Sequence, residues 1–369
     1  MKKLLVILSL CLAVVSLRAD DSKPPVRFAI IGLVHDHAGG FIPRLKGRED
    51  VQLAGIVEPD TEVAQRAVKR FHLDPNIIFP SLEALLAHTN IQAVATFTTT
   101  FAHRGVVEEC ARRGIHVVMM EKPMAVNMEH ARAIAKAAKA GSIQIIVNYE
   151  TTWYPGNQEA YRMVHDEDAI GDLRKIVAHD GHPGPIEIGC SKTFTDWLTD
   201  PVLNGGGALV DFGCYGADLV TWLMDNQRPT SVLCVTQHIK PEVYPKVEDE
   251  ATVLVTYPKA QAILQASWNW PYNRKDMEIY GKIGYILIPK SNILRVLKTG
   301  GAETETTVPP LTGPQADSVS YLAAVVRGEI EPSGLSSLAV NMTVTEILDA
   351  ARRSAATGRR VDLPKKPNH

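Results

Sequence analysis

Residues 114–141 read GIHVVMMEKPMAVNMEHARAIAKAAKAG and set the architecture of the first half of the chain. The apolar run Val117–Met120 predicts a short buried strand, and Glu121, Lys122 and Pro123 follow it directly. Open α/β sheets bind their ligands at the carboxyl ends of their strands, and proline fixes the backbone just beyond this one. We therefore expect the lysine at a place where it can reach a cofactor and a substrate together.

The segment after this strand carries the end signals of a helix. Asn127 is a favourable N-cap, and Gly141 is a favourable stop. From Val26 onward, short apolar runs alternate with helical patterns in the same way, as far as Tyr149. Such alternation predicts a parallel, doubly wound Rossmann sheet, which we expect over residues 25–148. The expected strands cover residues 26–33, 51–60, 91–99, 115–123 and 142–150.

Residues 149–365 follow a different pattern and are predicted to form a second, α+β domain. GGALVDFGCYGADLVTWLM, residues 206–224, predicts one strong helix, and two further helical patterns close the chain at 318–328 and 337–358. Between them, strand patterns follow one another with few helices, which indicates a mostly antiparallel sheet. These strands are expected at 231–239, 250–258, 261–270, 277–281 and 285–289.

The composition limits the partners and the compartment. The 369-residue chain has 45% hydrophobic and 22% charged residues, as ordinary globular proteins have, and its net charge of −2 argues against nucleic acid or an acidic surface as a partner. Residues 1–19 have the charged, apolar and small-residue order of a secretory signal, which predicts a periplasmic or secreted protein without a stable membrane span after cleavage. An uncleaved anchor is the alternative.

Four cysteines would remain after cleavage, and no pair has CxxC spacing, so the sequence signals neither a zinc ribbon nor a disulfide scaffold. Cys110 and Cys214 lie in apolar helical patterns and are expected to be core thiols. A bridge between Cys190 and Cys234 stays open, because an oxidising compartment would permit it.

The turn after the first strand reads GLVHDHAGG, residues 32–40. A full G-x-G-x-x-G would need glycine where Val34 and His37 stand, so the dinucleotide signal is weak. Gly32 can still form the tight turn, whereas the Cβ of Val34 limits how closely the backbone approaches a pyrophosphate. We expect His35 and His37 to line the cofactor or substrate cleft. A metal is the less favoured alternative, because no third ligand is indicated by spacing.

Further polar residues stand where a site would place them. Glu58 ends the second predicted strand, where a carboxylate binds ribose hydroxyls and disfavours a 2′-phosphate, so NAD is expected over NADP. The stretch His179–His182 reads as a polar loop that is either exposed or faces the substrate. Asp211, Tyr215 and Asp218 share one face of the predicted helix. The aspartate and tyrosine there could hold a sugar hydroxyl and relay its proton, although a tyrosine in the core is the alternative.

Together these segments resemble the glucose–fructose oxidoreductase/inositol dehydrogenase/MocA (Gfo/Idh/MocA) family over nearly the whole chain. The motifs that carry the resemblance are TTTFAH at 98–103, GIHVVMMEKP at 114–123, GGGALVDFG at 205–213, VEDEA at 247–251, MEIYG at 277–281 and SAATGRRVDLP at 354–364. The combination of EKP with GGGAlxDxG at this separation is specific. The resemblance implies a Rossmann domain followed by an α+β substrate domain, and possible homo-oligomers through the second sheet.

The resemblance also implies roles for individual residues. Lys122 would stand near the nicotinamide and the substrate hydroxyl, Glu121 near the nicotinamide ribose, and Asp211 at the substrate. Tyr215 takes the place of the common family histidine and becomes the candidate acid/base, with Lys122 lowering its pKa. The residues expected to bind the cofactor are Gly32, Val34, His35, His37, Glu58, Thr98, His103, Glu121, Lys122 and Asn148.

Three functions follow. The leading hypothesis is an NAD-dependent oxidoreductase that acts on a CH–OH group of a sugar or polyol and holds its cofactor tightly, because no free nicotinamide pool is expected outside the cytoplasm. The second is a redox-neutral, NAD-dependent glycoside hydrolase or lyase that works through a 3-keto intermediate. The third, motivated by the incomplete glycine turn, is a non-catalytic sugar- or nucleotide-binding protein.

Overall fold

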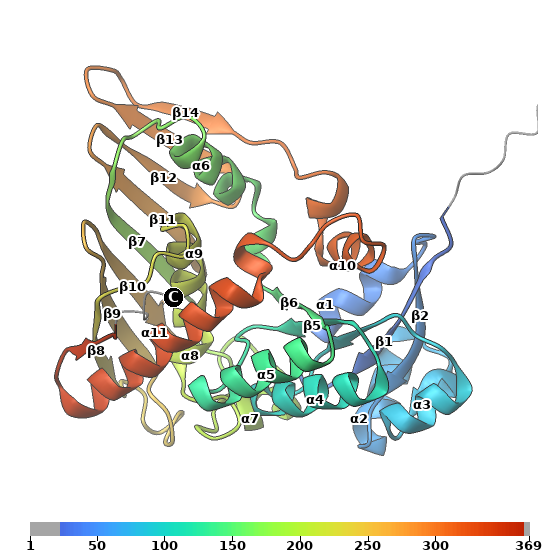
Figure 1. Ribbon diagram of the computed structural model, residues 1–369. Helices are drawn as coiled ribbons and strands as arrows, with labels where there is room; N and C mark the ends of the chain where they lie inside the picture. Colours follow the sequence, from blue (N-terminus) through green and yellow to red (C-terminus); the bar gives the residue numbers. More distant parts are fainter. Residues whose placement is uncertain (1–22, 365–369) are drawn as a thin grey trace, which may run out of the picture.

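The computed structural model describes residues 23–364 and places them in two sheets with their helices (Figure 1). The predicted secretory signal, residues 1–19, lies outside the described residues. The first sheet has six parallel strands in the order β3-β2-β1-β4-β5-β6, as the alternating pattern predicted. Its strands are β1 (Val26–Ile31), β2 (Val51–Val57), β3 (Ile78–Phe79), β4 (Ala93–Thr96), β5 (Val117–Glu121) and β6 (Gln144–Asn148).

Helices cover both faces of this sheet, and one of them comes from the far end of the chain. One face packs on α3, α4 and α5, while the other packs on α1 and on α10, which returns from residues 318–326 (Figure 1). The predicted caps of α5 are confirmed: the Asn127 side chain accepts a hydrogen bond from the His130 N–H at 2.9 Å, and Gly141 ends the helix. The helices are α1 (Ala38–Phe41), α2 (Thr61–Phe71), α3 (Leu82–His88), α4 (His103–Arg113), α5 (Met128–Ala140) and α10 (Ser318–Val326).

The second sheet has nine strands in the order β14-β13-β12-β11-β7-β10-β9-β8-β15. Only the central β7–β10 pair is parallel, so the mostly antiparallel prediction is confirmed. The strands are β7 (Leu173–Gly181), β8 (Ser231–Gln237), β9 (Glu250–Thr256), β10 (Gln261–Ser267), β11 (Arg274–Gly281), β12 (Gly284–Lys290), β13 (Ile293–Lys298), β14 (Thr304–Thr307) and β15 (Val361–Asp362).

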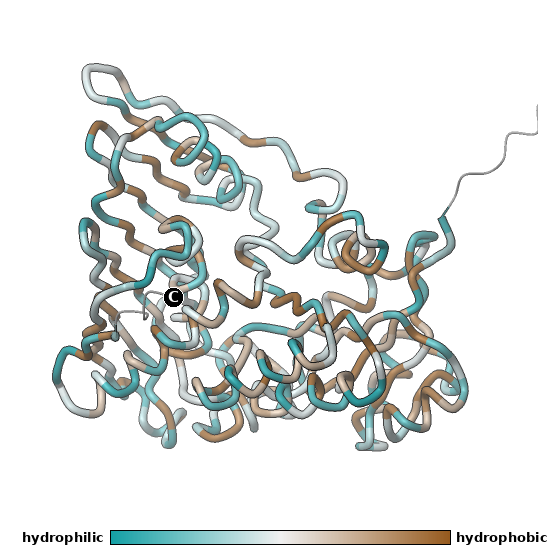
Figure 2. Tube along the Cα trace, viewed as in Figure 1, coloured by the Kyte–Doolittle hydropathy of each residue, from teal (hydrophilic) through white to brown (hydrophobic). Residues whose placement is uncertain are grey.

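The helices of the second half lie on one face of this sheet and against the first sheet (Figure 1). They are α6 (Pro155–His165), α7 (Lys192–Leu198), α8 (Ala208–Asp211), α9 (Gly213–Leu223) and α11 (Leu338–Thr357). Apolar residues concentrate between helices and sheets (Figure 2). On the opposite sheet face, Leu233 and Val235 of β8 are exposed. Homo-oligomer formation through this sheet stays a prediction.

The predicted single helix over residues 206–224 is wrong in one respect, because it is broken at Phe212. The short α8 ends at Asp211, and α9 starts at Gly213. The break lies directly after Asp211 and therefore changes how Asp211 and Tyr215 face each other, which the i, i+4 spacing of one continuous helix would have fixed.

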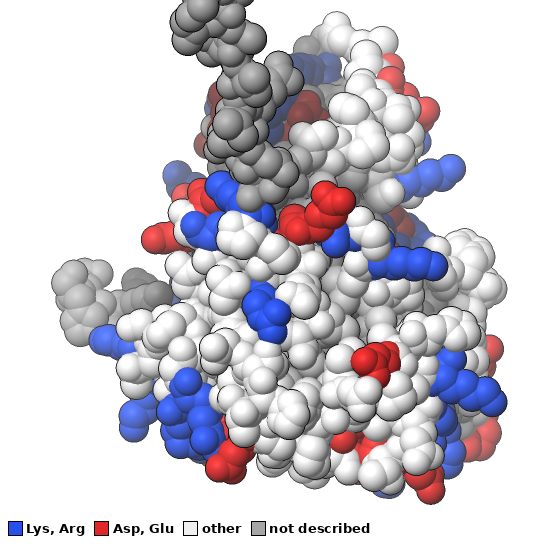
Figure 3. Space-filling view, turned by 90° about the vertical axis from the view of Figure 1, so that its right-hand side faces the viewer, with Lys and Arg blue, Asp and Glu red and all other residues white. Residues whose placement is uncertain are grey.

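Two further features of the described residues bear on the sequence predictions. Cys110 and Cys214 are buried thiols, as expected, and Cys190 and Cys234 are also free thiols in this structure. No helix among residues 23–364 is long and apolar enough to cross a membrane. On the face of the molecule drawn in Figure 3, basic and acidic side chains are interspersed, and neither sign forms a continuous patch.

Candidate active site

The pair Lys122–Asp211 joins the two halves of the molecule. Lys122 follows β5, Asp211 ends α8, and each is only 5% exposed. The Lys122 Nζ donates to the Asp211 Oδ1 at 2.5 Å and to its backbone oxygen at 2.9 Å. Trp268, which follows β10, donates its indole N–H to the other carboxyl oxygen at 3.0 Å. The EKP and GGGAlxDxG motifs therefore meet at one buried, fully paired charge pair.

The two partners hold each other in their charged forms. Burial alone would lower the pKa of Lys122, but Asp211 outweighs it and the pKa of the ammonium is raised. Burial alone would raise the pKa of Asp211, but Lys122 outweighs it and the pKa of the carboxyl is lowered. At neutral pH the pair thus supplies a fixed positive charge that can orient and polarise a substrate oxygen.

The expectation that Lys122 lowers the pKa of Tyr215 is wrong. The Tyr215 side chain is 2% exposed, and burial, assisted by Glu150, raises its pKa well above the ordinary value. The Lys122 ammonium lies 4.9 Å from the centre of the Tyr215 ring, so it contacts the π face while its hydrogen bonds go to Asp211. Tyr215 is therefore a neutral phenol that can donate a hydrogen bond but does not start as a base.

Asp218, the third residue of the predicted face, is not part of this cluster of bonded groups. It is fully buried, and neither carboxyl oxygen has a hydrogen-bond partner among the described residues. Burial raises its pKa well above the ordinary value, so it is uncharged. It is a core residue of α9.

The glycine turn is held by the second half of the chain. The Asp36 carboxylate accepts hydrogen bonds from the backbone N–H and the hydroxyl of Ser191, at 2.7 and 2.6 Å. Trp197 of α7 donates its indole N–H to the backbone oxygen of Val34 at 3.1 Å, and the His35 ring packs on Trp197 with ring centres 5.4 Å apart. The α7 segment thus holds the glycine turn in place, although Val34 and His37 stand where the full motif has glycines.

His35 supports the glycine turn, and its place in the cofactor or substrate cleft stays a prediction. It is 2% exposed, packs on α7 and also lines a small cavity with Asp36 and Ser191. Burial, followed by the neighbouring His37 and Lys122 charges, lowers the pKa of its imidazole well below the usual value. His35 is therefore neutral at physiological pH.

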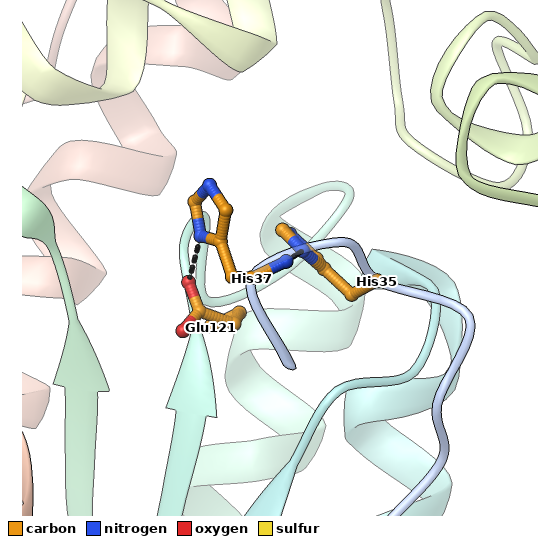
Figure 4. A group of neighbouring side chains, drawn as sticks. All are labelled: His35, His37 and Glu121. Carbon is orange, nitrogen blue, oxygen red and sulfur yellow. Dashed lines mark hydrogen bonds and ion pairs between the residues drawn. The ribbon is translucent and has the colours of Figure 1, made fainter. Parts of the chain in front are cut away.

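His37, Glu121 and Asn148 form a hydrogen-bonded row at the carboxyl ends of β5 and β6. The His37 Nδ1 is bonded to one oxygen of Glu121 at 2.8 Å (Figure 4), and the Asn148 amide donates to the other at 2.7 Å. Trp153 donates to the Asn148 amide oxygen at 3.0 Å. This row lines a cavity of about 500 Å³ together with Asp36, Gly40, Phe41, Arg44, Glu150, Trp153, Tyr154 and residues 316–318.

Glu121 lies beside the two histidines as a third possible metal ligand. The spacing in the sequence did not indicate this. One ligand-type atom from each of His35, His37 and Glu121 lies within 4.8 Å of the others. However, the His37 Nδ1 is engaged by Glu121, and the His35 Nδ1 accepts the backbone N–H of His37 at 3.2 Å. Because these nitrogens already serve hydrogen bonds inside the protein, we continue to expect this cluster to shape the cofactor cleft.

The remaining predicted cofactor residues surround the ends of β1, β2 and β4. Gly32 has φ +79°, and a Cβ placed on it would lie 2.5 Å from the Thr98 Cγ2, so this tight turn requires glycine. The Glu58 carboxylate accepts the Leu33 N–H at 2.8 Å and the Asp60 N–H at 3.0 Å. It therefore stabilises the glycine turn, and its remaining lone pairs stay free to accept from a ribose. These features fit a dinucleotide.

His103 is a predicted cofactor residue, and this role stays a prediction. It is fully buried, and its Nδ1 is bonded to the backbone oxygen of Met124 at 3.2 Å. It therefore supports the segment that follows Lys122 and Pro123. The peptide bond between those two residues is cis.

Stability is expected to fall on acidification because of His103. Burial, opposed in part by the Met124 carbonyl, lowers its pKa from 6.5 to about 4, so between these values the unfolded chain binds a proton that the folded protein does not. The linkage costs about 3 kcal/mol by pH 4. Urea unfolding at pH 7 and pH 4.5 should show a smaller loss in His103→Gln than in the wild type. The control His88→Gln, at an exposed helix end, should lose as much as the wild type.

Sequence reasoning placed His179–His182 in a polar loop, but β7 continues through Gly181, and His179 and Asp180 are buried.

Sequence reasoning did not single out Lys275 or Glu150. Lys275 lies on β11 with its ammonium 4.5 Å from the centre of the Tyr215 ring, and it bonds to Glu150. Strand alternation in the 274–281 segment was a usable signal for Lys275, because Lys275, Met277 and Ile279 share one face.

Comparison with known proteins gives this geometry a family. Residues 26–149 match the family described as "Oxidoreductase family, NAD-binding Rossmann fold", and residues 158–287 match the "GFO/IDH/MocA C-terminal domain". The chain belongs to the Gfo/Idh/MocA oxidoreductase family. The resemblance read from EKP and GGGAlxDxG is thus confirmed, as are the fold and NAD as the cofactor of the family's Rossmann domain.

Individual relatives span most of the chain. Inositol 2-dehydrogenase of Rhizobium meliloti (strain 1021) is 24% identical over 92% of this chain and 99% of its own length. Trans-1,2-dihydrobenzene-1,2-diol dehydrogenase of Xenopus laevis is 27% identical over 82% of this chain and 89% of its own. An aldose–aldose oxidoreductase from Caulobacter crescentus, complexed with glycerol, shares the fold with a TM-score of 0.77 and 23% identity, covering 92% of this chain and 100% of that one.

Proposed function

We propose that this Gfo/Idh/MocA oxidoreductase oxidises and reduces a CH–OH group of a sugar or polyol and keeps its NAD bound between turnovers. The observation that carries the substrate class is the Lys122–Asp211 pair, which sets a fixed cation and a carboxylate side by side where β5 ends. In such a pair the ammonium can donate a hydrogen bond to one hydroxyl oxygen, and the carboxylate can accept one from the adjacent hydroxyl group. This arrangement can bind a vicinal diol. The names of both relatives, inositol 2-dehydrogenase and trans-1,2-dihydrobenzene-1,2-diol dehydrogenase, denote cyclic alcohols with adjacent hydroxyl groups.

The chain's own residues divide the work as follows. When bound, NAD⁺ supplies the hydride acceptor. Lys122 holds and polarises the substrate oxygen, and Asp211 keeps the lysine charged and in place. Tyr215 offers its phenol as a hydrogen-bond donor beside Lys122. Glu121, tied to His37 and Asn148, is expected to hold the ribose next to the nicotinamide.

The test uses the purified protein without added cofactor. Mass spectrometry of the small molecules released on denaturation should find NAD, and adding a cyclic polyol should produce the absorbance and fluorescence of NADH in a single turnover. Protein that contains no NAD and binds none in calorimetry would contradict the proposal and favour a non-catalytic binding protein.

Tight retention of the cofactor is supported by the contacts of α7 with the glycine turn. Asp36→Ala removes both hydrogen bonds to Ser191, so the turn loses a tie to the second half of the chain. We expect NAD to dissociate at least about tenfold faster, which corresponds to about 1.4 kcal/mol, as measured by NAD remaining after timed gel filtration. Asp196→Ala, which removes an exposed α7 carboxylate paired with Lys192, is the matched control and should retain NAD like the wild type.

The same retention makes a redox-neutral reaction a second candidate. A cofactor that never leaves can oxidise a glycoside to its 3-keto form and later reduce the product, with no net NADH. Release of an aryl aglycone in stoichiometric excess over enzyme-bound NAD, without accumulation of NADH, would establish this reaction. Reduction of free sugars without cleavage of any aryl glycoside would exclude it in favour of the oxidoreductase.

We also propose that the protein is exported, on the basis of the signal-like order of residues 1–19. Cell fractionation combined with N-terminal peptide mass spectrometry tests this. A mature N-terminus near residue 20 in a periplasmic or secreted fraction is expected, whereas full-length protein in the cytoplasm would contradict export.

A further inference from the structure

A second pair of titratable side chains faces the same tyrosine from the other sheet. Asp180 of β7 and Lys275 of β11 are directly opposite in the antiparallel register, so their side chains emerge on one face of the sheet. Two residues along, Ala178 and Met277 form the next pair on that face, and both are buried. A Cβ placed on Gly216 of α9 would lie 3.0 Å from the Ala178 Cβ. Asp180 and Lys275 therefore face α9.

This pair is connected to the catalytic cluster and to solvent. The Lys275 and Lys122 ammonium groups lie 4.5 and 4.9 Å from the centre of the same Tyr215 ring. Lys275 also bonds to Glu150, whose side chain is 53% exposed and lines the 500 Å³ cavity beside Glu121 and Asn148. A line of polar groups thus runs from Asp180 through Lys275 and Glu150 to the cofactor cavity.

Asp180 stands out among these groups because it is unbonded. The residue is 2% exposed, and its carboxyl has no hydrogen-bond partner among the described residues, although it lies in a cluster of charges. Lys122 and Asp211 are occupied with each other, and Lys275 and Glu150 form a second bonded pair. Asp180 is the carboxyl group of this cluster that remains free to exchange a proton with a ligand.

The charges around Asp180 favour a carboxyl that carries a proton. Burial raises its pKa well above the ordinary value; Lys275 and Lys122 oppose the shift, and Asp276 and Glu150 add to it. The other titratable groups within electrostatic range are Cys214 of α9 and Tyr154 at the start of α6. A carboxyl group that holds its proton beside charged neighbours can act as the acid in acid–base catalysis.

We propose that Asp180 is the catalytic acid–base that exchanges the proton of the reacting hydroxyl, with Lys275 and Glu150 connecting it to solvent. In the oxidising direction the substrate C–H bond breaks and its electron pair leaves as hydride to NAD⁺. The O–H electrons form the C=O bond, and the proton passes to the Asp180 carboxylate. In the reducing direction the Asp180 carboxyl returns that proton to the carbonyl oxygen as hydride arrives. This inference rests on the proposed oxidoreductase function.

The experiment compares Asp180→Asn, which keeps the shape but cannot carry the proton, with Asp276→Asn. Asp276 lies next to Lys275 on the opposite face of β11, where it bonds to Arg274. In single-turnover reduction of a keto sugar by the reduced, cofactor-loaded protein, Asp180→Asn should slow hydride transfer about 10²–10⁴-fold. The fall in wild-type rate with rising pH, as the Asp180 carboxyl loses its proton, should disappear in this variant. Asp276→Asn should keep the wild-type rate at low pH and keep the fall with rising pH, which moves to lower pH because Asp276 helps to raise the pKa of Asp180.

A second readout does not depend on turnover. Infrared difference spectra across a pH titration should contain the band of a protonated carboxyl group that Asp180→Asn lacks and Asp276→Asn keeps. Absence of that difference, or an unchanged rate and pH profile in Asp180→Asn while Tyr215→Phe loses both, would overturn the inference. If the wild-type protein transfers hydride to or from none of the sugars and polyols tested, the proposed function is contradicted instead. In that case the infrared band alone shows whether Asp180 is protonated.

Discussion

Lys122→Met is expected to abolish turnover, with kcat for polyol oxidation at least about 10³-fold below the wild type. The ammonium is the fixed cation beside the reacting oxygen, and its hydrogen bonds to Asp211 place it there. Methionine fills a similar volume but supplies no charge. Stopped-flow detection of bound NADH measures the loss directly, because it reports hydride transfer separately from product release.

The same substitution should also destabilise the fold, since it leaves Asp211 buried without its cation. Breaking a buried ion pair on one side costs about 3–5 kcal/mol. The double variant Lys122→Met/Asp211→Asn removes the orphaned charge and should recover most of that stability while remaining inactive. Lys192→Met, at an exposed pair with Asp196, is the control and should change neither stability nor activity.

The double variant separates the two effects. If Lys122→Met retained wild-type kcat, Lys122 would not be the cation at the reacting oxygen. If the double variant regained activity together with stability, the loss in the single variant would reflect misfolding and not chemistry. Chemical unfolding and stopped-flow traces on the same preparations distinguish these results.

Gly207→Ala is expected to be the most destabilising conservative change in the GGGAlxDxG segment. A Cβ at Gly207 would lie 2.0 Å from the Glu248 backbone oxygen and 3.0 Å from the Val247 Cβ. The Ala208 N–H donates to the Glu248 backbone oxygen at 2.9 Å, so the two backbones cannot separate without losing this bond. Overpacking of this kind costs about 3 kcal/mol. Because α8 starts at the next residue, we also expect Asp211 to move and kcat to fall.

Gly105→Ala provides the matched control for this glycine. Gly105 lies inside α4, and no atom would lie within 4 Å of its added Cβ. Alanine is a better helix former there and should stabilise by about 0.5–1 kcal/mol. Thermal unfolding of both variants checks the pair of predictions. A Gly207→Ala protein as stable as the wild type would show that the Glu248 segment can retreat.

Much of the fold could be predicted from local pattern. The alternation of strands and helices from Val26 to Asn148 specified a parallel sheet, because each apolar run has the length and flanks of a buried strand. Asn127 and Gly141 marked the ends of α5 because capping depends on single residues. The helix over residues 206–224 was predicted as continuous, and its break at Phe212 was missed, because no proline marks that position in the sequence.

The candidate site could be predicted only in part. Lys122 and Asp211 came from motif positions, whereas their hydrogen bond depends on how the two sheets dock. The lowered pKa expected for Tyr215 was wrong because burial, invisible in sequence, dominates it. The contact of α7 with Val34 was also not predictable, since it joins segments far apart in the chain.

The sequence by itself determined most strands and helices of the first sheet and the lysine that follows β5, because periodicity, caps and strand ends are local properties. Only the tertiary structure decided what that lysine meets. It brings Asp211 into a hydrogen bond with Lys122 and places the Asp180–Lys275 pair of the second sheet beside Tyr215. It also packs α7 against the glycine turn. The physical reason is that charge pairing, burial and strand register arise between residues distant in sequence, and their energies exist only once the two sheets have packed together.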